Sequence, residues 1–126
     1  MAGEQILVVE DNQKNMKLLR DVLRATGYRT LEASTGDQAL MMATEYGPAL
    51  VLMDVRLPDM HGVEALNRLR MDERTASIPV LAVTAQAMKG DSKRFKEAGF
   101  DGYLSKPVDI DELLRTVELH CRGRRG

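Results

Sequence analysis

Five short segments of the chain have the hydrophobic pattern of β-strands. Residues 6–9, 49–53 and 79–83 are continuous apolar runs, which indicate strands buried on both faces of a sheet. Residues 28–33 alternate weakly between polar and apolar side chains, which indicates an edge strand. Residues 101–104 are predicted to form a short fifth strand.

Apolar residues recur at helical spacing after each predicted strand, and glycines mark several of the helix ends. The predicted helices cover residues 12–25, 36–46, 63–71, 87–98 and 109–120. The last of them should bury Ile110, Leu113, Leu114 and Val117. Because strands and helices alternate, we expect right-handed crossovers and an α/β fold, with a parallel sheet covered by helices on both faces.

The composition is that of one ordinary globular domain. The 126 residues are 44% hydrophobic and 29% charged, and the formal net charge of −1 argues against a general nucleic-acid binder. The sequence has no signal-peptide pattern and no apolar run of membrane-spanning length. The single cysteine, Cys121, excludes an internal disulfide and fits a reducing compartment. We therefore expect a cytoplasmic domain over residues 1–121, followed by a short, basic, disordered tail at 122–126.

Polar side chains follow four of the predicted strands. Glu10 and Asp11 follow the first, Asp54 the third, Thr84 the fourth and Lys106 the fifth. In a parallel sheet these ends share one edge. If the strand order is the 2-1-3-4-5 of one common doubly wound fold, which is an assumption at this stage, the first and third strands are neighbours and a crevice opens between them. Three carboxylates would then share one small site.

Carboxylates placed so close together require either protons or a cation. Two like charges roughly 4 Å apart repel by about 4 kcal/mol at an effective dielectric constant of about 20. Hard oxygen ligands that remain partly open to water suit Mg²⁺, which commonly binds one or two carboxylates together with a phosphate. Lys106 offers an ammonium to a second anionic group, and Thr84 offers a hydroxyl. These are the groups needed to move a phosphoryl group onto an aspartate.

Each of these residues also has an ordinary structural interpretation. Asp54 could cap a turn, and either Asp11 or Asn12 could be the N-cap of the first helix. Thr84 could be a plain strand-end hydroxyl, and Lys106 with Pro107 could form an ordinary turn. Those interpretations leave unexplained why all the residues fall on one edge, so we favour a joint site.

The same residues resemble the receiver domain of two-component response regulators, in register over essentially the whole chain. The resemblance rests on Glu10-Asp11, on the segment MDVRLPDMHG at 53–62, on Thr84-Ala85 and on Lys106-Pro107. It implies the flavodoxin-like (CheY-like) fold, a doubly wound five-stranded parallel sheet of order 2-1-3-4-5 with five helices. It also implies that Asp54 is the phosphoacceptor, which receives its phosphoryl group from a phosphohistidine on a histidine kinase or histidine phosphotransfer protein.

The resemblance implies roles for the residues around Asp54. Glu10, Asp11, Asp54 and the backbone carbonyl of Arg56 would bind Mg²⁺, for which Mn²⁺ could substitute. Lys106 would contact the phosphoryl oxygens, and the Lys106-Pro107 peptide bond would be cis, which costs an X–Pro bond only about 0.5–1 kcal/mol.

The resemblance further implies a switch through Thr84 and Tyr103. The phosphoryl group would draw the Thr84 hydroxyl inward, the Tyr103 ring would turn into the space left, and a face made of the fourth helix, fifth strand and fifth helix would change for a downstream effector. Alternatively, Tyr103 is simply a half-exposed aromatic on an edge strand. Arg56 and Gln86 occupy variable positions that would tune the phosphoryl lifetime in opposite directions.

Within the family the chain is most similar to single-domain, DivK-like cell-fate regulators, through Val9 to Asn12 and Val83 to Ala85 among other stretches. Our leading hypothesis is a stand-alone phosphorylation switch that catalyses only its own phosphorylation and dephosphorylation, without direct nucleic-acid or membrane contact. The alternatives are a receiver fragment of a larger regulator or hybrid kinase, and an interaction domain that works without phosphorylation. A flavodoxin-type ligand binder is disfavoured because Asp11 follows the first strand where a phosphate-cradling loop would be needed.

Overall fold

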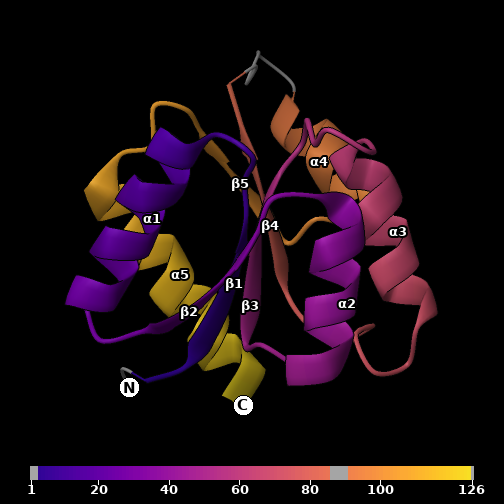
Figure 1. Cartoon of the computed structure of the whole chain (residues 1–126), viewed down its shortest axis with the longest axis horizontal. Coiled ribbons are helices and arrows are strands. Elements are labelled where there is room, and N and C mark those ends of the chain that lie inside the picture. Colours follow the sequence, from indigo (N-terminus) through magenta and orange to yellow (C-terminus); the bar gives the residue numbers. More distant parts are fainter. Residues whose placement is uncertain (1–2, 86–90, 126) are drawn as a thin grey trace.

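The computed structural model describes residues 3–85 and 91–125, which form a five-stranded parallel sheet with helices on both faces (Figure 1). The strand order is β2-β1-β3-β4-β5, as expected, and the weakly alternating strand β2 lies at an edge. The elements in chain order are β1 (Gln5–Val9), α1 (Gln13–Ala25), β2 (Arg29–Ala33), α2 (Gly36–Tyr46), β3 (Leu50–Asp54), α3 (Gly62–Met71), β4 (Val80–Thr84), α4 (Asp91–Ala98), β5 (Gly102–Ser105) and α5 (Ile110–Arg125).

The sheet separates two apolar cores, because successive side chains of a strand point to opposite faces. Helices α1 and α5 cover one face, and α2, α3 and α4 cover the other (Figure 1). In β1, Ile6 and Val8 pack toward α1 and α5, whereas Leu7 and Val9 pack toward α2 and α3. Both faces of the inner strands are therefore buried, which explains why the sequences of these strands are continuous apolar runs.

Side chains before α1, α2 and α3 cap their first turns. Asn12 accepts a hydrogen bond from the backbone N–H of Asn15 at 3.1 Å, so Asp11 remains free for the site. The cap of α2 is Thr35, whose side chain accepts from the N–H of Gln38 at 3.1 Å. The cap of α3 is His61, whose Nδ1 accepts from the N–H of Val63 at 3.1 Å. Such caps satisfy amides that the helix itself leaves unpaired.

Two expectations about the last helix are wrong. Helix α5 continues to Arg125 rather than ending at about His120, so the backbone of residues 122–125 is helical. The segment carries no proline, arginine is a good helix former, and the lone Gly123 costs only about 1 kcal/mol, so nothing in it stops the helix. Ile110 is 45% exposed, because it occupies the first position of α5, before the buried stripe that begins at Leu113.

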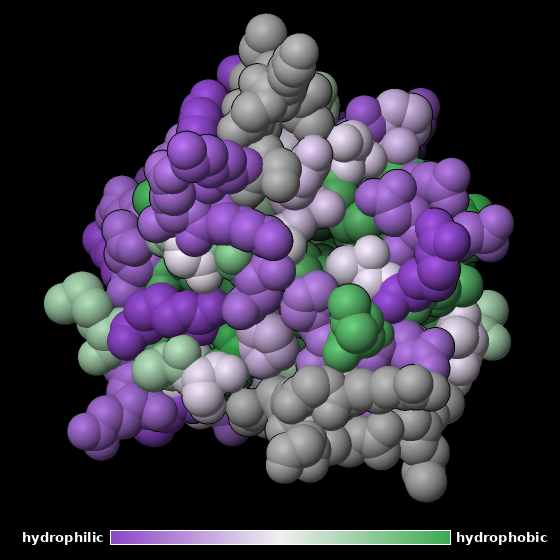
Figure 2. Space-filling model, turned by 180° about the vertical axis from the view of Figure 1, so that it is seen from behind, coloured by the Kyte–Doolittle hydropathy of each residue, from purple (hydrophilic) through white to green (hydrophobic). Residues whose placement is uncertain are grey.

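The surface and the fourth helix complete the comparison with the sequence. Met41 and Met71 are largely exposed, whereas the single cysteine, Cys121, is buried. Seen from behind, the molecule is mainly hydrophilic, with apolar side chains in small separate groups (Figure 2). Helix α4 is described from Asp91, so the predicted helical residues 87–90 lie outside the described residues. Among the described helices, none is long and apolar enough to cross a membrane.

Candidate functional site

The carboxyl ends of the inner strands meet at one edge of the sheet, the upper edge in Figure 1. A hollow of about 370 Å³ opens at this edge. Its lining includes every residue that the strand-end argument brought together, namely Glu10, Asp11, Asp54, Thr84 and Lys106, and also Arg56. The expected juxtaposition is therefore present in the structure.

Three carboxylates form the anionic part of the site. Glu10, Asp11 and Asp54 each place one oxygen within 4.8 Å of the others. Glu10 and Asp54 are buried, whereas Asp11 is exposed. Burial raises the pKa of the Glu10 carboxyl, and the hydrogen bonds from Lys106 and from the Asn12 amide offset that rise only in part. The nearby charge of Asp54 raises it further.

The ammonium of Lys106 bridges two of these acids. Its Nζ lies 2.7 Å from Oε1 of Glu10 and 3.0 Å from Oδ2 of Asp54. Burial alone would lower the pKa of Lys106, but the contacts with the two carboxylates outweigh it, so the pKa is raised and the side chain is an ammonium at neutral pH. The backbone fixes its position, because the N–H of Lys106 donates to the carbonyl of Thr84 at 2.8 Å.

The Asp54 carboxylate is held through both oxygens. Oδ2 contacts Lys106, and Oδ1 accepts a hydrogen bond from the backbone N–H of Arg56 at 3.0 Å. The chain beyond Asp54 then folds back on itself, since the N–H of Gly62 donates to the carbonyl of Val55 at 2.7 Å. A Cβ at Gly62 would lie 2.9 Å from Cα of Val55 and 3.0 Å from the carbonyl oxygen of Asp54. Only glycine allows α3 to start this close to the end of β3.

Sequence reasoning missed one contact of the β3–α3 loop. The carboxylate of Asp59 accepts hydrogen bonds from the N–H groups of Gly36, at 2.8 Å, and Asp37, at 3.0 Å, in the first turn of α2. These two hydrogen bonds lower the pKa of Asp59 below its usual value, and the bond from Gly36 has the larger effect. In the sequence, Pro58-Asp59 reads only as a turn, and no local pattern connects it with a helix more than twenty residues earlier.

The two predicted switch residues lie on the α4 side of neighbouring strands. Thr84 is buried at the end of β4. Tyr103 pairs with Ala82 in β4, two residues before Thr84, and its half-buried ring lies 5.6 Å from that of Phe95 in α4, centroid to centroid. Both interpretations of Tyr103 are compatible with this position. The Lys106-Pro107 bond is cis, as the resemblance implies, and Gln86 lies outside the described residues.

The donor set fits a hard divalent cation. It consists of carboxylate oxygens, one of the acids is open to solvent, and burial disfavours leaving Glu10 charged without a counterion. Lys106 supplies only part of the compensation, because it is one positive charge beside three acids. The residues present therefore match Mg²⁺ in ligand type and in charge.

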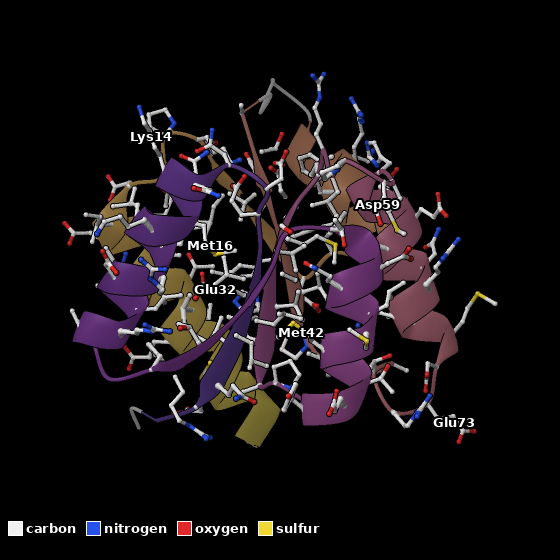
Figure 3. The ribbon with its side chains drawn as sticks, in the orientation of Figure 1. Lys14, Met16, Glu32, Met42, Asp59 and Glu73 are labelled. Carbon is white, nitrogen blue, oxygen red and sulfur yellow. The ribbon has the colours of Figure 1, made fainter. Side chains whose placement is uncertain are left out.

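A larger hollow of about 590 Å³ lies beside the site, between α1, the end of β2 and α2. Lys14, Met16 and Glu32, labelled in Figure 3, are among its lining residues, and Glu10 and Asp11 belong to both hollows. Its charges are of both signs and mostly paired, as Arg20 and Glu32 are at 3.3 Å. The smaller hollow is the one where the ammonium of Lys106 bridges two buried carboxylates.

Comparisons with known proteins agree with this geometry. The family model described as "Response regulator receiver domain" matches residues 6–118. The polar-differentiation response regulator DivK of Brucella ovis is 44% identical over 115 residues, which cover 91% of this chain and 94% of DivK. DivK of Brucella anthropi is 43% identical over the same shares.

Solved structures share the fold over nearly the whole chain. The receiver domain of the sensor histidine kinase PA1611 from Pseudomonas aeruginosa, which has a magnesium ion coordinated in its active-site cleft, is 37% identical with a TM-score of 0.87 and covers 95% of this chain and 98% of its own. The chemotaxis response regulator CheY4 of Vibrio cholerae is 26% identical with a TM-score of 0.87, and the match covers 94% of this chain and 99% of CheY4.

Proposed function

The chain belongs to the response regulator receiver domain family, a family of signalling switches, and from that premise we propose that it accepts a phosphoryl group on Asp54. The observation that carries the proposal is the position of Asp54. It ends the central strand β3, lines the hollow, and has one oxygen against the ammonium of Lys106 and the other against a backbone amide. A carboxylate with that access and those contacts is placed to act as a nucleophile.

The proposed reaction is a phosphoryl transfer from a phosphohistidine of a histidine kinase or histidine phosphotransfer protein. One oxygen of the Asp54 carboxylate forms a bond to phosphorus, and the phosphorus–nitrogen bond of the donor breaks, its electron pair leaving with the imidazole. A carboxylate nucleophile, unlike a hydroxyl, carries no proton that a general base must remove. Most of the catalysis of such a step is positioning and electrostatic stabilisation.

Residues around Asp54 would supply that stabilisation. Lys106 would shift from its contacts with the acids to the phosphoryl oxygens, and Thr84 would offer its hydroxyl. Glu10, Asp11, Asp54 and the backbone carbonyl of Arg56 would hold Mg²⁺, or Mn²⁺ in its place, and the ion would neutralise charge on the transferred group. The side chains of Arg56 and Gln86 are proposed to tune how long the phosphoryl group persists.

A switch through Thr84 and Tyr103 is supported by the contact of Tyr103 with α4. Because the Tyr103 ring packs against Phe95, movement of the ring into the sheet edge would alter the surface of α4, β5 and α5. Phosphate can bias such a change only if it binds one of two arrangements more tightly. The proposed readout is a downstream protein effector that binds this surface.

The similarity to DivK proteins supports a stand-alone, DivK-like regulator that works in the cytoplasm. Such a regulator would act by binding other proteins, without direct contact with nucleic acid or membrane. The same receiver could also be part of a larger regulator or hybrid kinase, like the kinase receiver among the solved structures. Phosphorylation at Asp54 is expected in both cases.

Intact-mass measurement after incubation with Mg²⁺ and acetyl phosphate tests the proposal. The protein should gain the mass of one phosphoryl group, and Asp54→Asn should gain none. Glu32→Gln is a matched control, since Glu32 is an exposed acid of β2 that does not line the site hollow. No gain by the unaltered chain would instead favour an interaction domain that works without phosphorylation, and an equal gain by Asp54→Asn would mean that another residue accepts the phosphoryl group.

A further inference from the structure

We propose that Asp59 is a positioning residue of the phosphoacceptor site, which holds the β3–α3 loop in place by capping α2. The inference rests on the proposed function for its meaning, but its geometry stands independently. Asp59 does not line the site hollow, so any effect on Asp54 must act through the loop between them.

The cap is bidentate and comes from a distant part of the chain. Oδ1 of Asp59 accepts from the N–H of Gly36, and Oδ2 accepts from that of Asp37. Thr35 already satisfies the third amide of the first turn, that of Gln38, so Asp59 takes the two that α2 cannot satisfy locally. A carboxylate is also the charge that a helix N-terminus favours. Figure 3 shows Asp59 beside the upper end of α2.

A second contact strengthens the attachment of the loop to α2. A Cβ at Gly36 would lie 2.5 Å from Sδ of Met60, so the Met60 side chain lies directly against the first residue of the helix. Helix α2 is itself fixed to the sheet through Ala39 and Ala43, which are fully buried. Two consecutive loop residues, Asp59 and Met60, are thus attached to a helix that is packed against the sheet.

A short series of contacts within the β3–α3 loop connects Asp59 and Met60 to the proposed acceptor, Asp54. The N–H of Leu57 donates to the carbonyl of Met60 at 3.3 Å, and Arg56 forms an antiparallel bridge with His61. The N–H of Arg56 in turn holds Oδ1 of Asp54. Fixing Asp59 and Met60 therefore fixes Arg56, whose amide orients the acceptor and whose carbonyl is proposed to face the metal.

Loss of the Asp59 cap should loosen this chain of contacts without removing any group from the site. Substitutions along such chains change the coupling between two sites by roughly twofold to thirtyfold. We expect the loss of this cap to weaken Mg²⁺ binding by about threefold to tenfold. Coupling is reciprocal, so Mg²⁺ binding should also shift the amide resonances of Gly36 and Asp37, although neither residue lines the site hollow.

The test compares Asp59→Asn with Asp72→Asn. Asp72 is a matched control, because its carboxylate also accepts a backbone N–H, that of Arg74 at 2.9 Å, but it lies at the other end of α3. Asp59→Asn retains one acceptor oxygen, so it is expected to fold, and circular dichroism checks this. Amide NMR spectra would be recorded during Mg²⁺ titrations, and acetyl phosphate kinetics would be measured with the KM and kcat effects separated.

In Asp59→Asn we expect the amide resonance of Arg56 to shift, Mg²⁺ binding to weaken by about threefold to tenfold, and phosphorylation to slow. In Asp72→Asn we expect none of these changes. If Asp59→Asn loses thermal stability alone, with the Arg56 amide and Mg²⁺ affinity unchanged, Asp59 is only a helix cap and the inference is overturned. If the unaltered chain accepts no phosphoryl group, the proposed function fails, while the NMR titration still decides whether Asp59 positions the loop.

Discussion

Lys106 and Glu10 form the closest ion pair of the described site, with 2.7 Å between Nζ and Oε1. Glu10 is also one of the three acids that fit a metal ion. The residue proposed to bind the phosphoryl group therefore contacts one of the acids that are proposed to hold the metal. In that proposal the lysine and the metal would compete for the same carboxylate, and each would partly compensate its burial.

Replacing Lys106 should consequently separate metal binding from phosphorylation. We expect Lys106→Met to bind Mg²⁺ about threefold to tenfold more tightly, because removal of a nearby positive charge leaves the acids more negative. Phosphorylation by acetyl phosphate should nevertheless slow, because the phosphoryl oxygens lose their cation. Calorimetric Mg²⁺ titration and intact-mass time courses measure the two effects. Weaker metal binding in Lys106→Met would show that the lysine organises the acids rather than competing with the ion.

The two glycines that contact the β3–α3 loop should respond differently to alanine. At Gly62 a Cβ meets backbone atoms of Val55 and Asp54, which cannot move independently of β3, so Gly62→Ala should cost about 1–3 kcal/mol in the free energy of unfolding. At Gly36 the three atoms nearest to such a Cβ all belong to the flexible side chain of Met60, and alanine gains about 1 kcal/mol of helix propensity. Urea unfolding should therefore find Gly36→Ala closer to the unaltered protein, and an equal loss in both variants would contradict this account.

The α2 cap should make part of the stability depend on pH. Because hydrogen bonds from Gly36 and Asp37 hold the pKa of Asp59 below its usual value of 3.8, the folded state binds the Asp59 proton less readily than the unfolded chain. The cap therefore contributes fully above the unfolded pKa, and its contribution is lost as the pH falls through the folded pKa.

Melting temperatures of the unaltered chain and Asp59→Asn, recorded from neutral pH down to about pH 3, measure this contribution, since the usual aspartate pKa of 3.8 lies within this range. The difference between the two proteins should be largest at neutral pH and shrink in acid. A difference that stays constant across the range would mean that the charge of Asp59 contributes nothing to the cap.

His61 offers a way to stabilise the start of α3. Its Nδ1 accepts the N–H of Val63, but aspartate is a preferred N-cap residue and also carries the charge that a helix N-terminus favours. We expect His61→Asp to raise the free energy of unfolding by about 0.5–1 kcal/mol at neutral pH, whereas His61→Ala should lower it. Urea denaturation measures both, and a less stable His61→Asp would indicate that the imidazole has contacts an aspartate cannot replace.

Local patterns in the sequence determined the elements and the chemistry at their ends. Continuous apolar runs located the inner strands, because a strand buried on both faces needs apolar side chains at every position. The strand-end residues Glu10, Asp54, Thr84 and Lys106 followed from parallel pairing alone, since parallel strands end on one edge. Asn12 was a recognisable cap candidate for the first helix for a similar reason, since its partner amide, that of Asn15, is only three residues away.

The tertiary structure decided what depends on residues far apart in the chain. Strand order was an assumption until β1 was seen beside β3. The contacts of Asp59 with Gly36 and of Lys106 with Glu10 join segments whose sequences carry no mutual signal, and the exposure of Ile110 depends on where α5 first meets the sheet. A hydrophobic or capping pattern reports a residue's preference for an environment, whereas packing alone determines which distant group provides it.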